Sequence, residues 1–333
     1  MDKMLHGGAL DRAMAGFGGR KTDWLDLSTG INPNPYPIPD VPEEIWHLLP
    51  DEALMADCLA AARSYYEVPT KSDLVAAPGT QALIQFLPLV TQAKKVWIVG
   101  PTYNEYERVF SASAEVIVST ELPQSVGDID VILVGSPNNP DGRVCDCEAV
   151  SALGKSIHKR GGFVLIDAAF GDVLPKDYSL PTALSDADGV VVFRSFGKFF
   201  GLAGLRLGFA IGGEGVINRF RTALGPWAVS GPSLFVGARA LRDQDWILDA
   251  RSELSGQRAS VEGMLRYNGF DIVGATDLFV TGSKIESTSL AKSLAKNYIL
   301  VRTFDYNSHW IRFGLPAGRE DFGRLEKALA EAL

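Results

Sequence analysis

The sequence predicts an α/β protein: a large domain with a mostly parallel, mixed sheet sandwiched by helices, and a smaller α+β domain. In the middle of the chain, buried apolar runs alternate with helical patterns, whereas the C-terminal third follows a different order. The chain has 333 residues, of which 46% are hydrophobic, so it is long enough to form a large core and two domains.

Five short runs rich in β-branched residues predict buried strands in the large domain. These runs are 94–100, 114–119, 130–136, 162–167 and 189–196. Helical patterns separate them at 80–92, 103–112 and 146–160. Such alternation is typical of a parallel sheet with helices on both faces.

The C-terminal third begins with a long amphipathic stretch at about 245–268. Strand and helix patterns then alternate as far as a final helix that runs to Leu333. We expect an N-terminal segment at 1–40 that contributes to the active site and the small domain, a large domain at 41–244, and a small domain at 245–333. The stretch 28–40 is too rich in proline and asparagine for regular structure.

The net charge of −8 argues against nucleic acid or an anionic membrane as the main partner. A few local arginines still allow an anionic substrate. The three cysteines, Cys58, Cys145 and Cys147, fit a reducing compartment, and their spacing does not predict a metal site. The sequence shows neither a signal-peptide pattern nor a run of about 18 apolar residues, so we expect a cytoplasmic protein without a membrane span.

Lys198 is the centre of the candidate chemistry, because it directly follows a predicted buried strand. A charged amine there is costly unless it has a function. A desolvated lysine has a lowered pKa and can act as a nucleophile. Four glycines between 197 and 208 allow a tight turn around a bulky ligand, and Arg206 supplies a guanidinium suited to phosphate.

The string from Ser195 to Gly208 resembles the lysine motif of fold-type I enzymes that use pyridoxal 5′-phosphate (PLP), in the class I and II aminotransferase branch. The similarity covers nearly the whole chain and is greatest to the histidinol-phosphate aminotransferase and threonine-phosphate decarboxylase group. It implies that Lys198 holds PLP as a Schiff base, in a homodimer with active sites near the interface. Leu49 stands where this group often has a tyrosine that contacts the neighbouring subunit's cofactor, and it cannot make that hydrogen bond.

The resemblance also implies a binding site for the cofactor phosphate. Gly79, Thr80 and Gln81 begin a predicted helix, and helix N-termini bind phosphate through free N–H groups. By resemblance, Ser195 and Arg206 close the other side of this site.

The cofactor ring is implied to lie against Tyr103 and to receive a hydrogen bond from Asn139 at its phenolic oxygen. Asn139 belongs to a turn motif that departs from the family pattern at Ser136 and Asp141. Neither departure changes Asn139 itself.

Asp167 ends a predicted strand, where a carboxylate must be paired or functional. The resemblance implies that it pairs with the pyridinium nitrogen and keeps the ring an electron sink. Phe170 stands where the family usually has a tyrosine that touches the phenolic oxygen, so we expect an altered pKa for the bound imine.

Two strand patterns near the C-terminus each carry an arginine, Arg302 and Arg312. In the resembled group the second arginine binds the substrate carboxylate and the first helps to bind a substrate phosphate. Two guanidinium groups suit a doubly anionic amino acid.

The N-terminal residues His6, Gly7 and Gly8, with the later segment around Asn32, resemble the opening of threonine-phosphate decarboxylases. We expect the backbone near Gly7 and Gly8, with His6, to meet the substrate phosphate. Asn32 is the candidate partner of the α-carboxylate.

The resemblance therefore implies PLP-dependent decarboxylation of L-threonine O-3-phosphate to (R)-1-amino-2-propanol O-2-phosphate and carbon dioxide, a step of cobalamin biosynthesis. The alternative is a histidinol-phosphate aminotransferase or a related aminotransferase, which uses nearly the same catalytic residues. Those aminotransferases usually carry an acidic dipeptide where this chain has Gln81 and Ala82. The intact cofactor motifs argue against a third class, a non-catalytic binding protein of the same fold.

Overall fold

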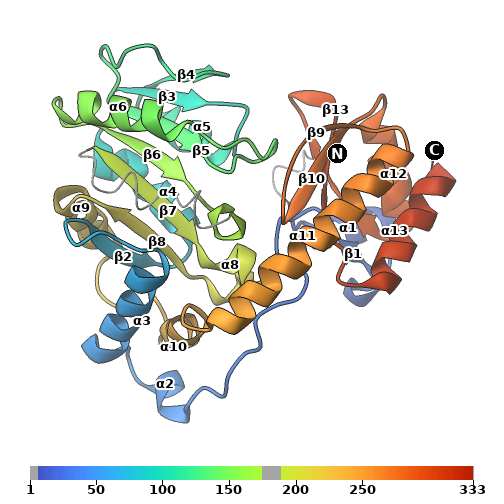
Figure 1. Ribbon diagram of the computed structural model, residues 1–333, viewed down its shortest axis with the longest axis horizontal. Helices are drawn as coiled ribbons and strands as arrows, with labels where there is room; N and C mark the ends of the chain where they lie inside the picture. Colours follow the sequence, from blue (N-terminus) through green and yellow to red (C-terminus); the bar gives the residue numbers. More distant parts are fainter. Residues whose placement is uncertain (1–6, 175–188, 333) are drawn as a thin grey trace. The chain divides into compact units, whose positions relative to one another are not determined.

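The computed structural model describes residues 7–174 and 189–332, so His6 lies outside the described residues. The chain divides into two compact units (Figure 1). Unit 1 comprises residues 1–35 and 247–333, and unit 2 comprises residues 36–246. The division falls within the long helix α11 (Gln244–Tyr267).

Unit 2 contains a seven-stranded sheet in the order β2-β8-β7-β6-β5-β3-β4 (Figure 1). The strands from β7 to β4 are parallel, whereas β8 is antiparallel to both of its neighbours. The bounds are β2 (Asp73–Ala77), β3 (Lys95–Val99), β4 (Glu115–Ser119), β5 (Val131–Gly135), β6 (Phe163–Asp167), β7 (Val190–Ser195) and β8 (Gly208–Gly212). The central strand β5 is buried at every residue, as a strand covered on both faces must be.

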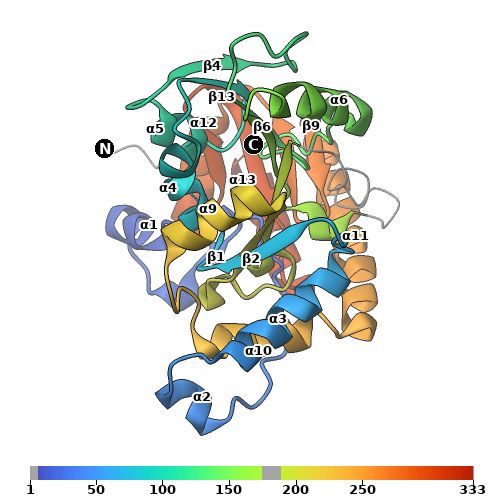
Figure 2. The same ribbon diagram turned by 90° about the vertical axis from the view of Figure 1, so that its left-hand side faces the viewer.

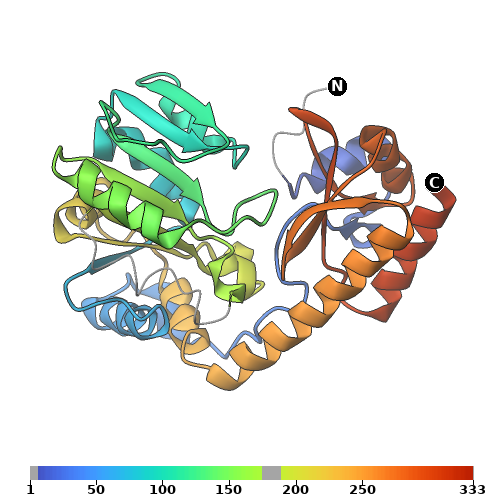
Figure 3. The same cartoon turned by 45° about the horizontal axis from the view of Figure 1, so that its top comes forward.

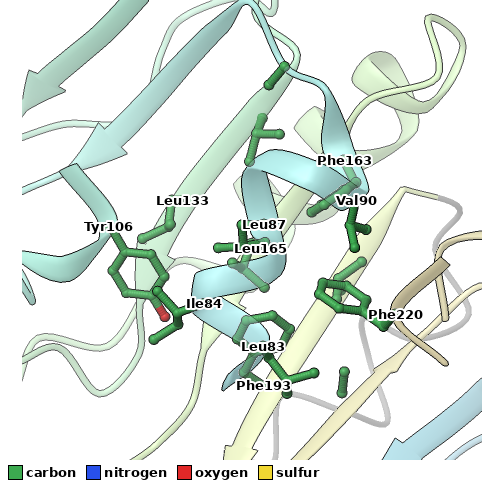
Figure 4. Packing of buried hydrophobic residues seen from close by; sticks show 14 of the residues in the cluster. Leu83, Ile84, Leu87, Val90, Tyr106, Leu133, Phe163, Leu165, Phe193 and Phe220 are labelled. Carbon is green, nitrogen blue, oxygen red and sulfur yellow. The ribbon is translucent and has the colours of Figure 1, made fainter. Parts of the chain in front are cut away.

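Helices cover both faces of this sheet, with α4 and α6 on opposite sides in Figure 2. The helices are α2 (Glu43–His47), α3 (Glu52–Tyr65), α4 (Thr80–Thr91), α5 (Glu105–Phe110), α6 (Cys147–His158), α8 (Phe196–Phe199), α9 (Glu214–Leu224) and α10 (Gly231–Ala240). Between α4 and the sheet lies the main hydrophobic cluster, where Leu83 and Leu87 meet Leu165 and Phe193 (Figure 4). Asp146 caps α6 by accepting hydrogen bonds from two backbone N–H groups.

The predicted α/β fold is confirmed, and each of the five predicted strands is present. Two strands of the large sheet were missed. β8 begins and ends with glycine, so its sequence resembles the end of the preceding turn, and β2 is a short strand that begins with an aspartate. Lys198 lies in the one-turn helix α8, which directly follows β7.

Unit 1 has an α+β arrangement, as predicted (Figure 3). Its antiparallel sheet has the order β12-β13-β10-β9, and β1 pairs in parallel with β11. The strands are β1 (Leu25–Asp26), β9 (Asp271–Thr276), β10 (Phe279–Ser283), β11 (Ile299–Leu300), β12 (Arg302–Phe304) and β13 (Asn307–Gly314). With most of α11, the helices are α1 (Leu10–Phe17), α12 (Ser287–Lys296) and α13 (Arg319–Ala332).

The segment from Ser28 to Pro42 forms neither helix nor strand, in agreement with its proline content. Among residues 7–174 and 189–332, no helix is both long and apolar enough to cross a lipid bilayer.

Candidate active site

The ends of three strands meet in one row of the large sheet. Ala77 at the end of β2 and Ser195 at the end of β7 both pair with Gly208, the first residue of β8. α4 begins just after β2, so its first N–H groups lie at this row, and a Cβ on Gly208 would come within 2.7 Å of the Thr80 nitrogen. The row therefore presents backbone donors beside the side chain of Ser195.

Arg206 lies at the same place, immediately before β8. Its backbone is left-handed, with φ of 54°, a conformation that a non-glycine residue adopts at a cost and that often marks a functional site. A Cβ on Gly79 would lie 2.6 Å from Arg206 Nη2, so only glycine lets the guanidinium approach the start of α4 this closely. Amide donors at a helix N-terminus together with an arginine make an anion site of the size of a phosphate.

Lys198 lies in a chain segment rich in buried aromatic residues. Phe196, Phe199 and Phe200 are buried, and the rings of Phe196 and Phe200 stack with centroids 4.4 Å apart. The Lys198 Nζ atom lies 5.6 Å from the centroid of the Phe170 ring. This position is one where a cation is attracted to the ring face.

Asp167 ends β6 and has two protein donors. The Tyr106 hydroxyl donates to Oδ2 at 2.7 Å, and the Ala169 N–H donates to Oδ1 at 3.0 Å. Burial raises the pKa of Asp167 above its ordinary value, while these hydrogen bonds and the charge of Lys198 oppose the rise. Asp167 and Lys198 are thus close enough to influence each other's charge.

Tyr103 is oriented by a chain of hydrogen bonds. Its hydroxyl donates to Gln81 Oε1 at 3.0 Å, and Gln81 Nε2 donates to Glu105 Oε2 at 2.8 Å. Glu105 is buried and also accepts from Arg108 Nε at 2.7 Å. Glu105, Arg108 and Tyr106 were not predicted as residues of the site. The available signal was the three-residue spacing from Tyr103, which lies just before α5, to Tyr106 within it.

The turn that presents Asn139 is fixed by its neighbour Asn138. Asn138 is fully buried, accepts from Thr102 Oγ1 at 2.7 Å and donates to Asp141 Oδ1 at 2.8 Å. The Asp141 carboxylate also accepts from the Arg143 N–H at 3.1 Å. The aspartate that departs from the family motif therefore stabilises the turn.

In unit 1, Arg302 and Arg312 lie directly opposite each other across β12 and β13. Like charges in that position are destabilising. Arg312 is buried, and its Nη2 donates to the Ser28 carbonyl at 2.7 Å. Burial, and then the charge of Arg302, lower the pKa of Arg312 to about 9. An anion bound to this arginine pair would offset both costs.

The N-terminal glycines lie at the same Ser28. A Cβ on Gly7 would clash with the Ser28 carbonyl oxygen, which is the oxygen that Arg312 contacts. The Gly8 N–H donates to Ser28 Oγ at 2.7 Å, so this donor is already used within the protein. The buried side chain of Asn32 accepts from the Asn34 N–H at 2.8 Å.

Comparison with known proteins assigns the chain to a family. The sequence profile of aminotransferase class I and II matches residues 43–328. The chain belongs to the class I and II aminotransferase family. This family uses PLP, and the chain is a PLP-dependent enzyme.

Within the family, similarity is high to proteins named threonine-phosphate decarboxylase. The one from Sinorhizobium sp. is 42% identical over 98% of both chains, and the one from Pseudomonas aeruginosa is 37% identical over 97% of this chain and 96% of its own. The histidinol-phosphate aminotransferase of Sinorhizobium meliloti, solved in complex with PLP, shares the fold with a TM-score of 0.83. It is 18% identical, over 97% of this chain and 94% of its own.

The residues of unit 2 fit PLP. The site formed by the start of α4, Ser195 and Arg206 suits its phosphate, and Lys198 supplies an amine for its aldehyde. The carboxylate of Asp167 is of the kind needed beside a ring nitrogen that must stay protonated.

Proposed function

We propose that this chain decarboxylates L-threonine O-3-phosphate with PLP, giving (R)-1-amino-2-propanol O-2-phosphate and carbon dioxide in cobalamin biosynthesis. The observation that carries the proposal is the pair Arg302 and Arg312, which lie opposite each other while Arg312 is buried. Such a pair favours a ligand with two anionic groups. Two decarboxylases that match nearly the full length support the same reaction.

In this proposal Arg312 binds the α-carboxylate with Asn32, and Arg302 binds the phosphate together with the His6–Gly8 segment. Because the Gly8 N–H donates to Ser28, the Gly7 backbone is the better candidate donor within that segment. Their charge and the resemblance to the family support these roles.

Unit 2 supplies the remaining groups. When bound, PLP supplies an electron-poor ring that accepts the electron pair of the breaking bond. Asp167 would hold a negative charge for the ring nitrogen, Asn139 would donate to the phenolic oxygen, and Tyr103 would lie against the ring face. The bond between Cα and the carboxylate breaks, carbon dioxide leaves, and Lys198 Nζ delivers one proton to Cα.

Transamination of histidinol phosphate is the alternative, since it needs the same lysine and aspartate. It is not favoured, because the histidinol-phosphate aminotransferase of known structure is far less similar than the two decarboxylases. The glutamine and alanine at positions 81 and 82 also differ from the acidic dipeptide that is usual in those aminotransferases.

A carboxyl-labelled substrate separates the two reactions. PLP-loaded protein is incubated with labelled L-threonine O-3-phosphate, and released carbon dioxide is measured. In parallel, histidinol phosphate is supplied with 2-oxoglutarate and glutamate is measured. Labelled carbon dioxide without glutamate supports the proposal. Glutamate without carbon dioxide overturns the decarboxylase assignment and leaves the cofactor assignment standing.

Arg312 gives the substrate complex a defined pH dependence. Burial and the charge of Arg302 lower its pKa to about 9, so we expect the guanidinium to be charged and to bind carboxylate below that pH, and to bind it less well above. We therefore expect the KM for L-threonine O-3-phosphate to rise as the pH increases through about 9. The product (R)-1-amino-2-propanol O-2-phosphate is the control, because it keeps the amine and phosphate but has no carboxylate. Its inhibition constant should rise much less, and equal rises would contradict the role of Arg312.

We also infer that the chain forms a homodimer. Several large apolar side chains near the start of unit 2 are exposed in the single chain, which is unusual unless another surface covers them. They are Ile38, Trp46, Leu48 and Leu49, each at least 63% exposed. Light scattering should give twice the mass of the chain, and Trp46→Glu should shift the population toward monomer. A fully active wild-type monomer would contradict the inference.

A further inference from the structure

Tyr106 has a hydroxyl group that packing alone does not explain. The residue is fully buried in the cluster between α4 and the sheet, among side chains such as Ile84 and Leu133 (Figure 4). A phenylalanine would fill this space equally well. A buried hydroxyl costs free energy unless it makes a good hydrogen bond, and that of Tyr106 donates to Asp167 Oδ2 at 2.7 Å.

We infer that Tyr106 is a positioning residue that holds the Asp167 carboxylate in its charged form and in a fixed orientation toward the ring nitrogen of PLP. The inference deepens the cofactor part of the proposed function and does not depend on which substrate reacts. It rests on a short hydrogen bond between two residues that come from different elements, α5 and the end of β6.

The pKa shifts of Tyr106 and Asp167 support the role of Tyr106 as donor to a charged Asp167. Burial, followed by the Asp167 charge and hydrogen bond, raises the pKa of Tyr106 well above its ordinary value, so its hydroxyl keeps the proton and remains a donor. A donor stabilises the ionised carboxylate, and here it opposes the burial that raises the pKa of Asp167. A charged Asp167 in turn favours a protonated ring nitrogen.

The place of Tyr106 in the fold adds to the argument. Tyr103, the proposed ring contact, lies three residues before Tyr106. The two rings meet edge to face with centroids 6.2 Å apart. Tyr103 is held by Gln81, and Tyr106 holds Asp167. The segment 103–106, which leads into α5, thus orients two groups proposed to contact the cofactor.

The test compares Tyr106→Phe with Tyr66→Phe. Tyr66 is also buried, and within the described part of the chain its hydroxyl has no hydrogen-bond partner, so it is a matched control. Apo protein is titrated with PLP, and the absorbance of the bound cofactor is followed against pH. We expect Tyr106→Phe to raise the dissociation constant of PLP about tenfold. We also expect it to shift the pH midpoint of the absorbance change. Tyr66→Phe should alter neither quantity.

A double-mutant cycle with Asp167→Asn shows whether Tyr106 acts through Asp167. In that background, Tyr106→Phe should have little further effect on PLP affinity. Unchanged affinity and absorbance in Tyr106→Phe would overturn the inference, as would effects that simply add to those of Asp167→Asn. If wild-type protein binds no PLP, the proposed function fails instead, so the two failures are distinguishable.

Discussion

Lys198→Ala should reduce decarboxylation by about a thousandfold or more, the largest effect expected of any single substitution in this chain. The change removes the amine that attacks the cofactor aldehyde, and it removes the group proposed to return a proton to Cα. Proton transfer by a positioned side chain alone contributes about 10²–10⁴-fold to the rate of an enzyme, and loss of the nucleophile adds to that.

Reduction with borohydride tests whether the cofactor is attached to Lys198 itself. In wild-type protein the reduced cofactor should stay attached to the peptide that contains Lys198, whereas in Lys198→Ala it should be lost on denaturation. Lys155 is an exposed lysine of the same unit, so Lys155→Ala is the control and should keep both the label and the turnover. A label on any other peptide of the wild-type protein would refute the role of Lys198.

The second large effect concerns substrate choice. Wild-type enzyme should prefer L-threonine O-3-phosphate over threonine by about a hundredfold or more, because a charge-assisted hydrogen bond contributes about 1.5–3 kcal/mol and at least two are proposed for the phosphate. Arg302→Ala should remove most of this preference in kcat/KM. The absorbance of bound PLP should stay the same, since Arg302 is not among the proposed cofactor contacts.

Arg312→Ala should behave differently from Arg302→Ala. It should lower kcat/KM for both substrates, because both carry the α-carboxylate. Arg266 is an exposed arginine of the same unit that pairs with Glu262, so Arg266→Ala should change neither substrate. If Arg302→Ala keeps the full preference for the phosphorylated substrate, the phosphate binds elsewhere and the assignment of the two arginines is wrong.

The strands of the large sheet were predictable because their burial requires continuous apolar runs such as Val131–Gly135. β8 was not, because a strand that begins and ends with glycine has no such signature. Lys198, Asp167 and Asn139 could be proposed as site residues from the sequence because each lies in a motif with several fixed positions. Tyr106 was missed because its role depends on a contact with Asp167, which is distant in sequence.

The same limit applies at the N-terminus. The glycines at 7 and 8 were recognised as a motif, but the sequence could not show that Ser28 would take the Gly8 N–H. Nor could it show that the Ser28 carbonyl would accept a hydrogen bond from Arg312. These hydrogen bonds depend on the path of the irregular segment after Asp26. That segment has no hydrophobic periodicity from which its path could be predicted.

The antiparallel strand β8 links cofactor binding to the integrity of the sheet. Arg206 reaches the start of α4 only when β8 is inserted between β2 and β7, because Gly208 aligns with the ends of both. A partly unfolded chain in which β8 has detached would keep the parallel strands but lose the proposed phosphate site. A ligand that binds only the complete sheet stabilises it by mass action. PLP bound at the proposed site would therefore stabilise this end of the sheet, and we expect the apo chain to unfold there first under heat or denaturant.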